Sequence, residues 1–152
     1  MPKMTMDPDD PPPRHVALDL SIRTLLPGRV VRVLAIGVDE YALRVRYETI
    51  PAFDPRDSND PDWQERNDWY LTGRDNHDNL YESGGGARGP SMDGSRTEGV
   101  YSLLGLPAAD VSWLDIAFHA FGDPESFERP RYVLRVNMPL NVVVIEPPTN
   151  WP

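Results

Sequence analysis

The stretch Tyr41-Ala-Leu-Arg-Val-Arg-Tyr-Glu48 decides the fold class of this chain. Large apolar side chains alternate in it with mostly charged ones, which is the pattern of a β-strand with one buried face. The preceding segment Arg29–Ile36 is rich in valine, and Gly37-Val-Asp39 lies between the two as a turn sequence. The two segments are therefore predicted to pair as a β-hairpin. The residues predicted on the buried face are Tyr41, Leu43, Val45 and Tyr47.

Strand patterns of the same kind recur along the chain of 152 residues. No segment keeps the 3.6-residue period of a helix, and Pro107–Asp110 alone is predicted to form a helical turn. About seven to nine strands in this length predict an all-β fold, namely an antiparallel immunoglobulin-like β-sandwich with long loops. A small barrel is the alternative. The other predicted strands are Val16–Ile22, Trp69–Thr72, Gly99–Leu104, Ser112–His119, Arg131–Met138 and Asn141–Glu146.

Composition excludes several classes of function. The chain has 15 lysine and arginine residues against 24 aspartate and glutamate residues, a net charge of −9, and it contains no cysteine. Binding to nucleic acid or anionic lipid is disfavoured by this charge, and disulfides and thiolate catalysis are excluded. No stretch approaches the roughly 18 apolar residues of a membrane span. Because Met1–Arg14 has no apolar segment typical of a secretory signal, a cytoplasmic location is expected.

Proline divides the chain into three predicted parts. Residues 1–13 are expected to be a disordered Pro-rich tail, since five prolines and three aspartates fall within them. Residues 14–146 are predicted to form the β-sandwich domain. Residues 147–152, with three more prolines, are predicted to be a short C-terminal tail that Trp151 pins to the domain.

The interval from residue 51 to residue 99 is polar and rich in aspartate, and it is predicted to form long loops that carry the function. Asp75, Asp78 and Asn79 lie close together in it, and carboxylate and amide oxygens are the ligands that Ca²⁺ prefers. They are the candidate metal ligands, although the spacing is not that of an EF-hand. The alternative is that these residues fill turns by bonding to their own backbone.

A glycine run from Gly84 to Gly89 lies in the same interval. It lacks the lysine and the following helix of a phosphate-binding loop, so the prediction is a flexible connection between strands that becomes ordered on a partner. Aromatic residues nearby suit contact with a protein or a sugar. The residues predicted to contact a partner are Trp63, Trp69, Gly84, Gly85, Gly86 and Arg88. For Trp69 a place in the core is the alternative.

Nothing in the sequence favours hydrolysis. Ser91 lies outside a nucleophile-elbow motif, and the three histidines are far apart. His119 falls on the strand face opposite the apolar residues, where it is predicted to be at the rim or in solvent. No cofactor fingerprint is present, and calcium is the one cofactor suggested.

The segment Asp75-Asn-His-Asp-Asn-Leu-Tyr81, followed by Gly84–Gly86 and later by Leu106-Pro-Ala-Ala-Asp110, resembles an immunoglobulin-like sandwich domain found in uncharacterised bacterial proteins. That family carries an Asp-x-x-Gly-Asn-x-Tyr hairpin before a Gly-rich loop, and here Asp78 stands where the pattern has glycine. The resemblance implies the fold and brings no catalytic residue.

These observations favour a non-catalytic binding or assembly module that acts through protein–protein contacts, including self-association through an edge strand. The alternative is a calcium- or carbohydrate-binding domain that uses the 51–99 loops. A hydrolase with its site on those loops is the third hypothesis.

Overall fold

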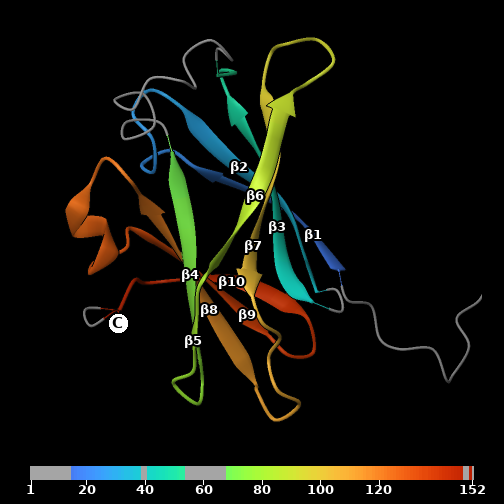
Figure 1. Ribbon diagram of the computed structural model, residues 1–152, viewed down its shortest axis with the longest axis vertical. Helices are drawn as coiled ribbons and strands as arrows, with labels where there is room; N and C mark the ends of the chain where they lie inside the picture. The colour runs from blue at the N-terminus through green and yellow to red at the C-terminus, as the bar shows by residue number, and fades with distance from the viewer. Residues whose placement is uncertain (1–14, 39–40, 54–67, 149–150, 152) are drawn as a thin grey trace, which may run out of the picture.

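Two antiparallel sheets of five strands each pack face to face in a computed structural model, which describes residues 15–38, 41–53, 68–148 and 151 (Figure 1). The predicted β-sandwich is confirmed, and the barrel alternative is wrong because the two sheets stay separate. In sheet A the strands are, in spatial order, β1 (His15–Ile22), β2 (Val30–Val38), β3 (Ala42–Ile50), β7 (Thr97–Leu104) and β6 (Ser83–Pro90). In sheet B they are β10 (Asn141–Ile145), β9 (Tyr132–Asn137), β8 (Trp113–Ala120), β4 (Trp69–Asp75) and β5 (Leu80–Tyr81).

The stretch that predicted the fold is strand β3, at the centre of sheet A. Leu43, Val45 and Tyr47 are fully buried between the sheets, as their alternation predicts. Tyr41 differs from its prediction, because it lies before the strand begins and is 77% exposed. Strand β2 pairs with β3 as the predicted hairpin, with Val31 opposite Thr49 and Val38 opposite Leu43.

Aromatic rings fill the core where β3, β4, β7 and β8 face one another. Trp69 is fully buried, and its ring centroid lies 4.7 Å from that of Tyr47, 4.4 Å from that of Tyr101 and 5.5 Å from that of Phe118. Gly99 makes room for this cluster, since a Cβ atom there would come within 2.6 Å of the Tyr47 ring. The cluster joins the two sheets by apolar packing.

The 51–99 interval differs most from its prediction. The sequence predicts one strand in it, Trp69–Thr72, and long loops elsewhere, but from residue 69 onward the described chain forms β4, β5, β6 and the start of β7. Strand β4 confirms the predicted strand, and β5 and β6 replace predicted loop. The glycine run is strand β6, paired with β7 through partners such as Gly86 with Tyr101 and Arg88 with Gly99. Glycine shows no alternation of side chains, so the strand is visible only once β7 supplies its hydrogen-bonding partner. Residues 54–67 lie outside the described residues, as does the predicted tail 1–13.

Helical structure is confined, within the described residues, to the 3-10 turn η2 (Pro124–Phe127). The carboxylate of Asp123 caps it by accepting a hydrogen bond from the Glu125 amide at 3.1 Å. The predicted helical turn Pro107–Asp110 is wrong, because that segment is a non-helical turn in which the Val111 amide bonds to the Ala108 carbonyl.

The outer face of sheet B, turned away from sheet A, is covered. Ala117 and Val133 are fully buried there against Trp151, with Ile145 beside them. Trp151 donates a hydrogen bond from Nε1 to Thr72 Oγ1 at 2.9 Å, and the guanidinium of Arg74 lies 5.1 Å from its ring centroid. Trp151 therefore packs on the sandwich across strands β4, β8 and β9.

Candidate functional site

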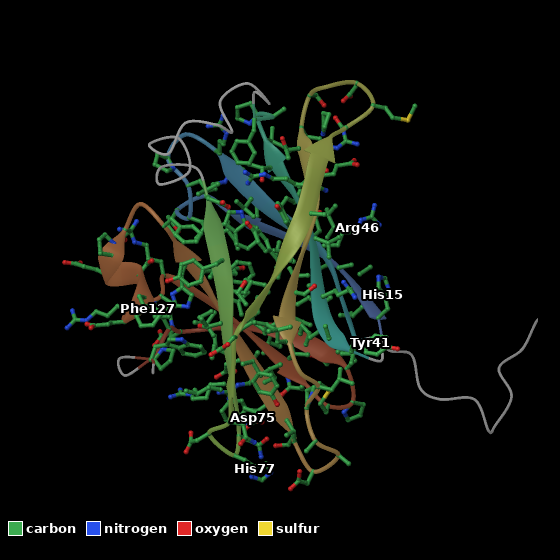
Figure 2. All side chains as sticks on the ribbon, viewed as in Figure 1. His15, Tyr41, Arg46, Asp75, His77 and Phe127 are labelled. Carbon is green, nitrogen blue, oxygen red and sulfur yellow. The ribbon has the colours of Figure 1, made fainter. Side chains whose placement is uncertain are left out.

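The predicted metal ligands lie at the hairpin that joins β4 to β5 (Figure 2). Asp75 is fully buried, and each of its carboxylate oxygens accepts two hydrogen bonds. Oδ1 accepts from the backbone amides of His77 and Asn79 at 2.9 and 3.0 Å. Oδ2 accepts from the Asn79 side-chain amide at 3.0 Å and from the Tyr81 hydroxyl at 2.8 Å. The carboxylate is thus used to build the turn.

The charge of Asp75 is stabilised by these donors. Burial by itself raises the pKa of the carboxyl group, but the hydrogen bonds from Tyr81, Asn79 and His77 outweigh it and lower the pKa below its usual value. Asp78 has a φ of 61°, in the left-handed region that favours glycine. Aspartate is one of the few residues other than glycine that adopts this conformation, so Asp78 suits the turn. The family resemblance stays a prediction.

No group of three histidine, aspartate or glutamate side chains in the described part of the chain is placed to hold a metal ion. Asp78 and Asn79 are exposed on the hairpin, whereas the Asp75 carboxylate faces the turn. The geometry therefore gives Asp75 a structural role, and calcium binding stays a prediction with no observation of the structure in its favour.

The predicted partner contacts are divided by the fold. Trp69 is fully buried in the core, so its core alternative is the one that the structure supports, and it cannot touch a partner directly. Gly84, Gly85 and Gly86 lie on β6 with Arg88, and Trp63 lies outside the described residues. The sequence predicts that the glycines form a flexible connection, and this is wrong because they belong to strand β6, which pairs with β7. A Cβ atom at Gly86 would collide with the Val100 carbonyl, which fixes glycine there.

Gly86 and Arg88 border a hollow of about 250 Å³, with Tyr47, Asp68, Ala87 and Tyr101. The Tyr101 hydroxyl donates to Asp68 Oδ1 at 2.8 Å, and Arg88 lies 3.4 Å from the same oxygen. Burial raises the pKa of Tyr47 to about 12 and raises that of Tyr101 further. Both phenols are therefore neutral near pH 7, and neither is activated as a nucleophile or base.

Ser91 and His119 are each used by the local structure. The Ser91 hydroxyl donates to Asp93 Oδ1 at 2.7 Å within one turn. His119 was predicted to be at the rim or in solvent, and this is wrong because it is fully buried. Its Nε2 lies 2.6 Å from Thr72 Oγ1 and its Nδ1 lies 2.6 Å from the Ser126 carbonyl oxygen. The sequence could not show that η2 and Trp151 cover this strand face.

The sheet edges offer a different kind of site. Among the described strands, β1, β6, β5 and β10 each have a neighbour on one side only. Natural proteins protect such edges with bulges, charges, prolines or short strands. Strand β1 has a register irregularity between Ala17 and Leu20, with Asp19 inside it. Strand β6 has an irregularity between Ser83 and Gly86 and ends at Pro90, and β5 is two residues long.

Strand β10 has none of these protections. Its sequence Asn141-Val-Val-Val-Ile145 contains no charge, glycine or proline. It pairs with β9 without a register irregularity, from Asn141 opposite Asn137 to Ile145 opposite Val133. Val143 is 44% exposed and Val144 is 51% exposed. The sequence predicted this strand but not that it would be an edge, since strand order is not readable from one sequence.

Comparison of the chain with protein-family models, with curated proteins and with solved structures finds no match. Across the described residues there is no helix of the length and apolar character needed to cross a membrane.

Proposed function

We propose that this protein is a non-catalytic binding or assembly module that acts through protein–protein contacts, and that strand β10 is the contact site. The observation that carries the proposal is the contrast between β10 and the three protected edges. An edge strand presents a row of backbone N–H and C=O groups that a further strand can pair with.

The side chains of β10 support the same proposal. Val143 and Val144 point to opposite faces of sheet B, because Val143 lies opposite Arg135 and Val144 lies opposite Leu134 of the core. An added strand would cover apolar surface on both faces, and burial of apolar surface is the main favourable term in protein association. Backbone pairing and apolar contact would thus act together.

The candidate chemistry elsewhere supports a non-catalytic module. Asp75, His119 and Ser91 each serve as hydrogen-bonding groups within the fold, as their distances show. A catalytic acid, base or nucleophile must instead reach a substrate.

Site-specific photo-crosslinking tests the proposal. Replacing Val143 with p-benzoylphenylalanine in the full chain should give a covalent adduct with a protein in cells after irradiation. The matched control carries the same residue at Ala17, which is exposed on the protected edge β1. An adduct at position 143 and none at position 17 is expected. No adduct at position 143, or equal adducts at both positions, would overturn the proposal.

A further inference from the structure

We infer that the partner of β10 is β10 of a second copy of this chain, paired antiparallel about a two-fold axis that passes between the two Val143 residues. The inference rests on the proposed function, because it names the partner of the same edge. The resulting dimer would join two copies of sheet B into one continuous sheet.

Charge is the first argument. Two copies of a chain with a net charge of −9 repel each other over most of their surface. Strand β10 contains no charged residue, so two copies can approach there without like charges in direct contact. With the axis at Val143, residues whose numbers sum to 286 lie opposite each other. The two Glu146 residues then lie beyond opposite ends of the paired segment, so their carboxylates are kept apart.

Proline supplies the second argument, because it fixes the register. Pro139 lies four residues before Val143 and Pro147 lies four residues after it. Proline cannot donate a hydrogen bond to a sheet ladder, so it limits how far a strand can pair. The chain turns back to β9 at residues 138–140, so the segment of β10 that can pair is Asn141–Ile145. The register centred on Val143 pairs all five of its residues, whereas a shifted register leaves part of the strand unpaired or places Pro147 opposite it.

Self-complementarity of the side chains is the third argument. The same register places Val142 opposite Val144 on the inner face and Val143 opposite its own copy on the outer face. Valine pairs across neighbouring strands are among the contacts that stabilise a sheet. Val143 and Val144, the two half-exposed valines of the strand, are both covered by the dimer.

The size of the contact sets the expected strength. One pair of five-residue strands buries less than the roughly 1,600 Å² of a standard stable interface. We therefore expect a reversible dimer with a Kd in the micromolar range, which shifts to monomer on dilution.

Sedimentation velocity of the purified full chain, over a dilution series from high to low micromolar, tests the inference. The wild-type chain should shift from dimer towards monomer. Val143→Lys and Val143→Glu should each weaken self-association at least tenfold, because each places like charges opposite each other at the axis. An equimolar mixture of the two variants should recover the dimer, because lysine then faces glutamate. Ala17→Lys is the matched control, and it should sediment as the wild type does.

Each contrary result is decisive. A wild-type chain that stays monomeric, or a Val143→Lys variant that associates as strongly as the wild type, overturns the inference.

Failure of the mixed variants to recover the dimer overturns the Val143-centred register. Thermal midpoints equal to that of the wild type show that both variants are folded. Val143→Glu is the substitution less apt to disturb the fold, because Arg135 lies opposite position 143 on β9. If the purified chain is monomeric while Val143 cross-links to another protein, this inference fails and the proposed function stands. If neither association nor cross-linking occurs, both fail.

Discussion

The outer faces of the two sheets differ although their strand sequences look alike. On sheet A, the outward residues Arg44 and Arg46 of β3 are exposed, and Arg46 points away from the sheet (Figure 2). On sheet B, the outward residues Asp115 and His119 of β8 are 1% and 0% exposed. The difference arises because Trp151 and η2 cover sheet B. A polar residue at every second position therefore predicts an outward face, and not whether solvent reaches it.

The covered face holds a hydrogen-bond chain with a defined direction. Trp151 Nε1 can only donate, so Thr72 Oγ1 accepts from it. The Ser126 carbonyl can only accept, so His119 Nδ1 carries the proton. Nε2 of His119 is then left to accept from the Thr72 hydroxyl. The chain is satisfied throughout when His119 is neutral, and burial lowers the pKa of His119 accordingly.

The largest expected difference in stability between the two outer faces comes from removing an arginine. Arg135 bonds both oxygens of the buried Asp115, at 2.8 and 3.0 Å. Arg135→Met removes both of these hydrogen bonds from a buried carboxylate, and we expect a loss of about 3–5 kcal/mol in the free energy of unfolding, measured by urea denaturation. On sheet A, Glu48 lies 3.0 Å from Arg32 and 2.9 Å from Arg96.

Arg32→Met is the matched control, because Arg96 still neutralises Glu48 after the change. Its loss should be a small fraction of that of Arg135→Met. Equal losses in the two variants would mean that the two outer faces do not differ in their electrostatics.

The next largest difference in stability between the two faces should come from removing an aromatic side chain. Trp151 is 6% exposed and packs on Ala117 and Val133, so Trp151→Ala should cost about 2–4 kcal/mol. Tyr41→Ala, at an exposed site beside sheet A, should change stability by less than about 0.5 kcal/mol. Thermal midpoints measured side by side check both values, and an unaltered midpoint for Trp151→Ala would show that sheet B does not need its cover.

Acid should destabilise the covered face through His119. Its folded-state pKa lies below the unfolded value of about 6.5, so the unfolded chain binds the proton first as the pH falls. Stability is therefore full above about pH 7 and decreases as the pH falls from about 6.5 towards the lower folded-state pKa. The groups in contact with His119 are all uncharged: Tyr70, Thr72, Ser126 and Phe127.

Two variants isolate this effect. His119→Gln should be less stable at pH 7.5 and should lose the slope between pH 7.5 and pH 5.5. His77→Gln, at an exposed histidine, should keep it. A wild-type unfolding midpoint that is the same at both pH values would contradict the assignment of a neutral His119.

The sequence predicted the fold where side chains alternate and failed where they do not. Strands β2, β3, β8 and β9 carry their own period-two patterns, and these were predicted within one or two residues. Half of the residues of strand β6 are glycine, so no alternating pattern is visible in the sequence until β7 pairs with it. The many aspartates of residues 51–99 predict loops, because aspartate favours turns. Asp75 instead ends strand β4, and its carboxylate points inward to the Tyr81 hydroxyl.

The candidate site depended on information that one sequence does not hold. Asn141–Glu146 was predicted as a strand, but its place at the edge of sheet B follows from strand order, which is set by long-range pairing. The burial of His119 likewise depends on distant contacts, such as that with Thr72 of β4, which lies 47 residues earlier in the chain. Local patterns thus indicated which residues form strands, while the exposed and covered surfaces required the assembled sheets.

The smallest expected effect lies on the open face, at Arg46. Its cross-strand neighbours on β2 and β7 are Ala35 and Val100, so no carboxylate faces it from the adjacent strands of the described sheet. Arg46→Thr keeps a side chain that suits a β-strand and removes only an exposed charge, so the free energy of unfolding should change by less than about 0.5 kcal/mol. Urea denaturation at low ionic strength is the appropriate measurement, because it retains surface electrostatics. A loss above about 1 kcal/mol in the free energy of unfolding would show that this face of sheet A is also covered in solution. The two sheets would then differ only in the segment that covers each of them.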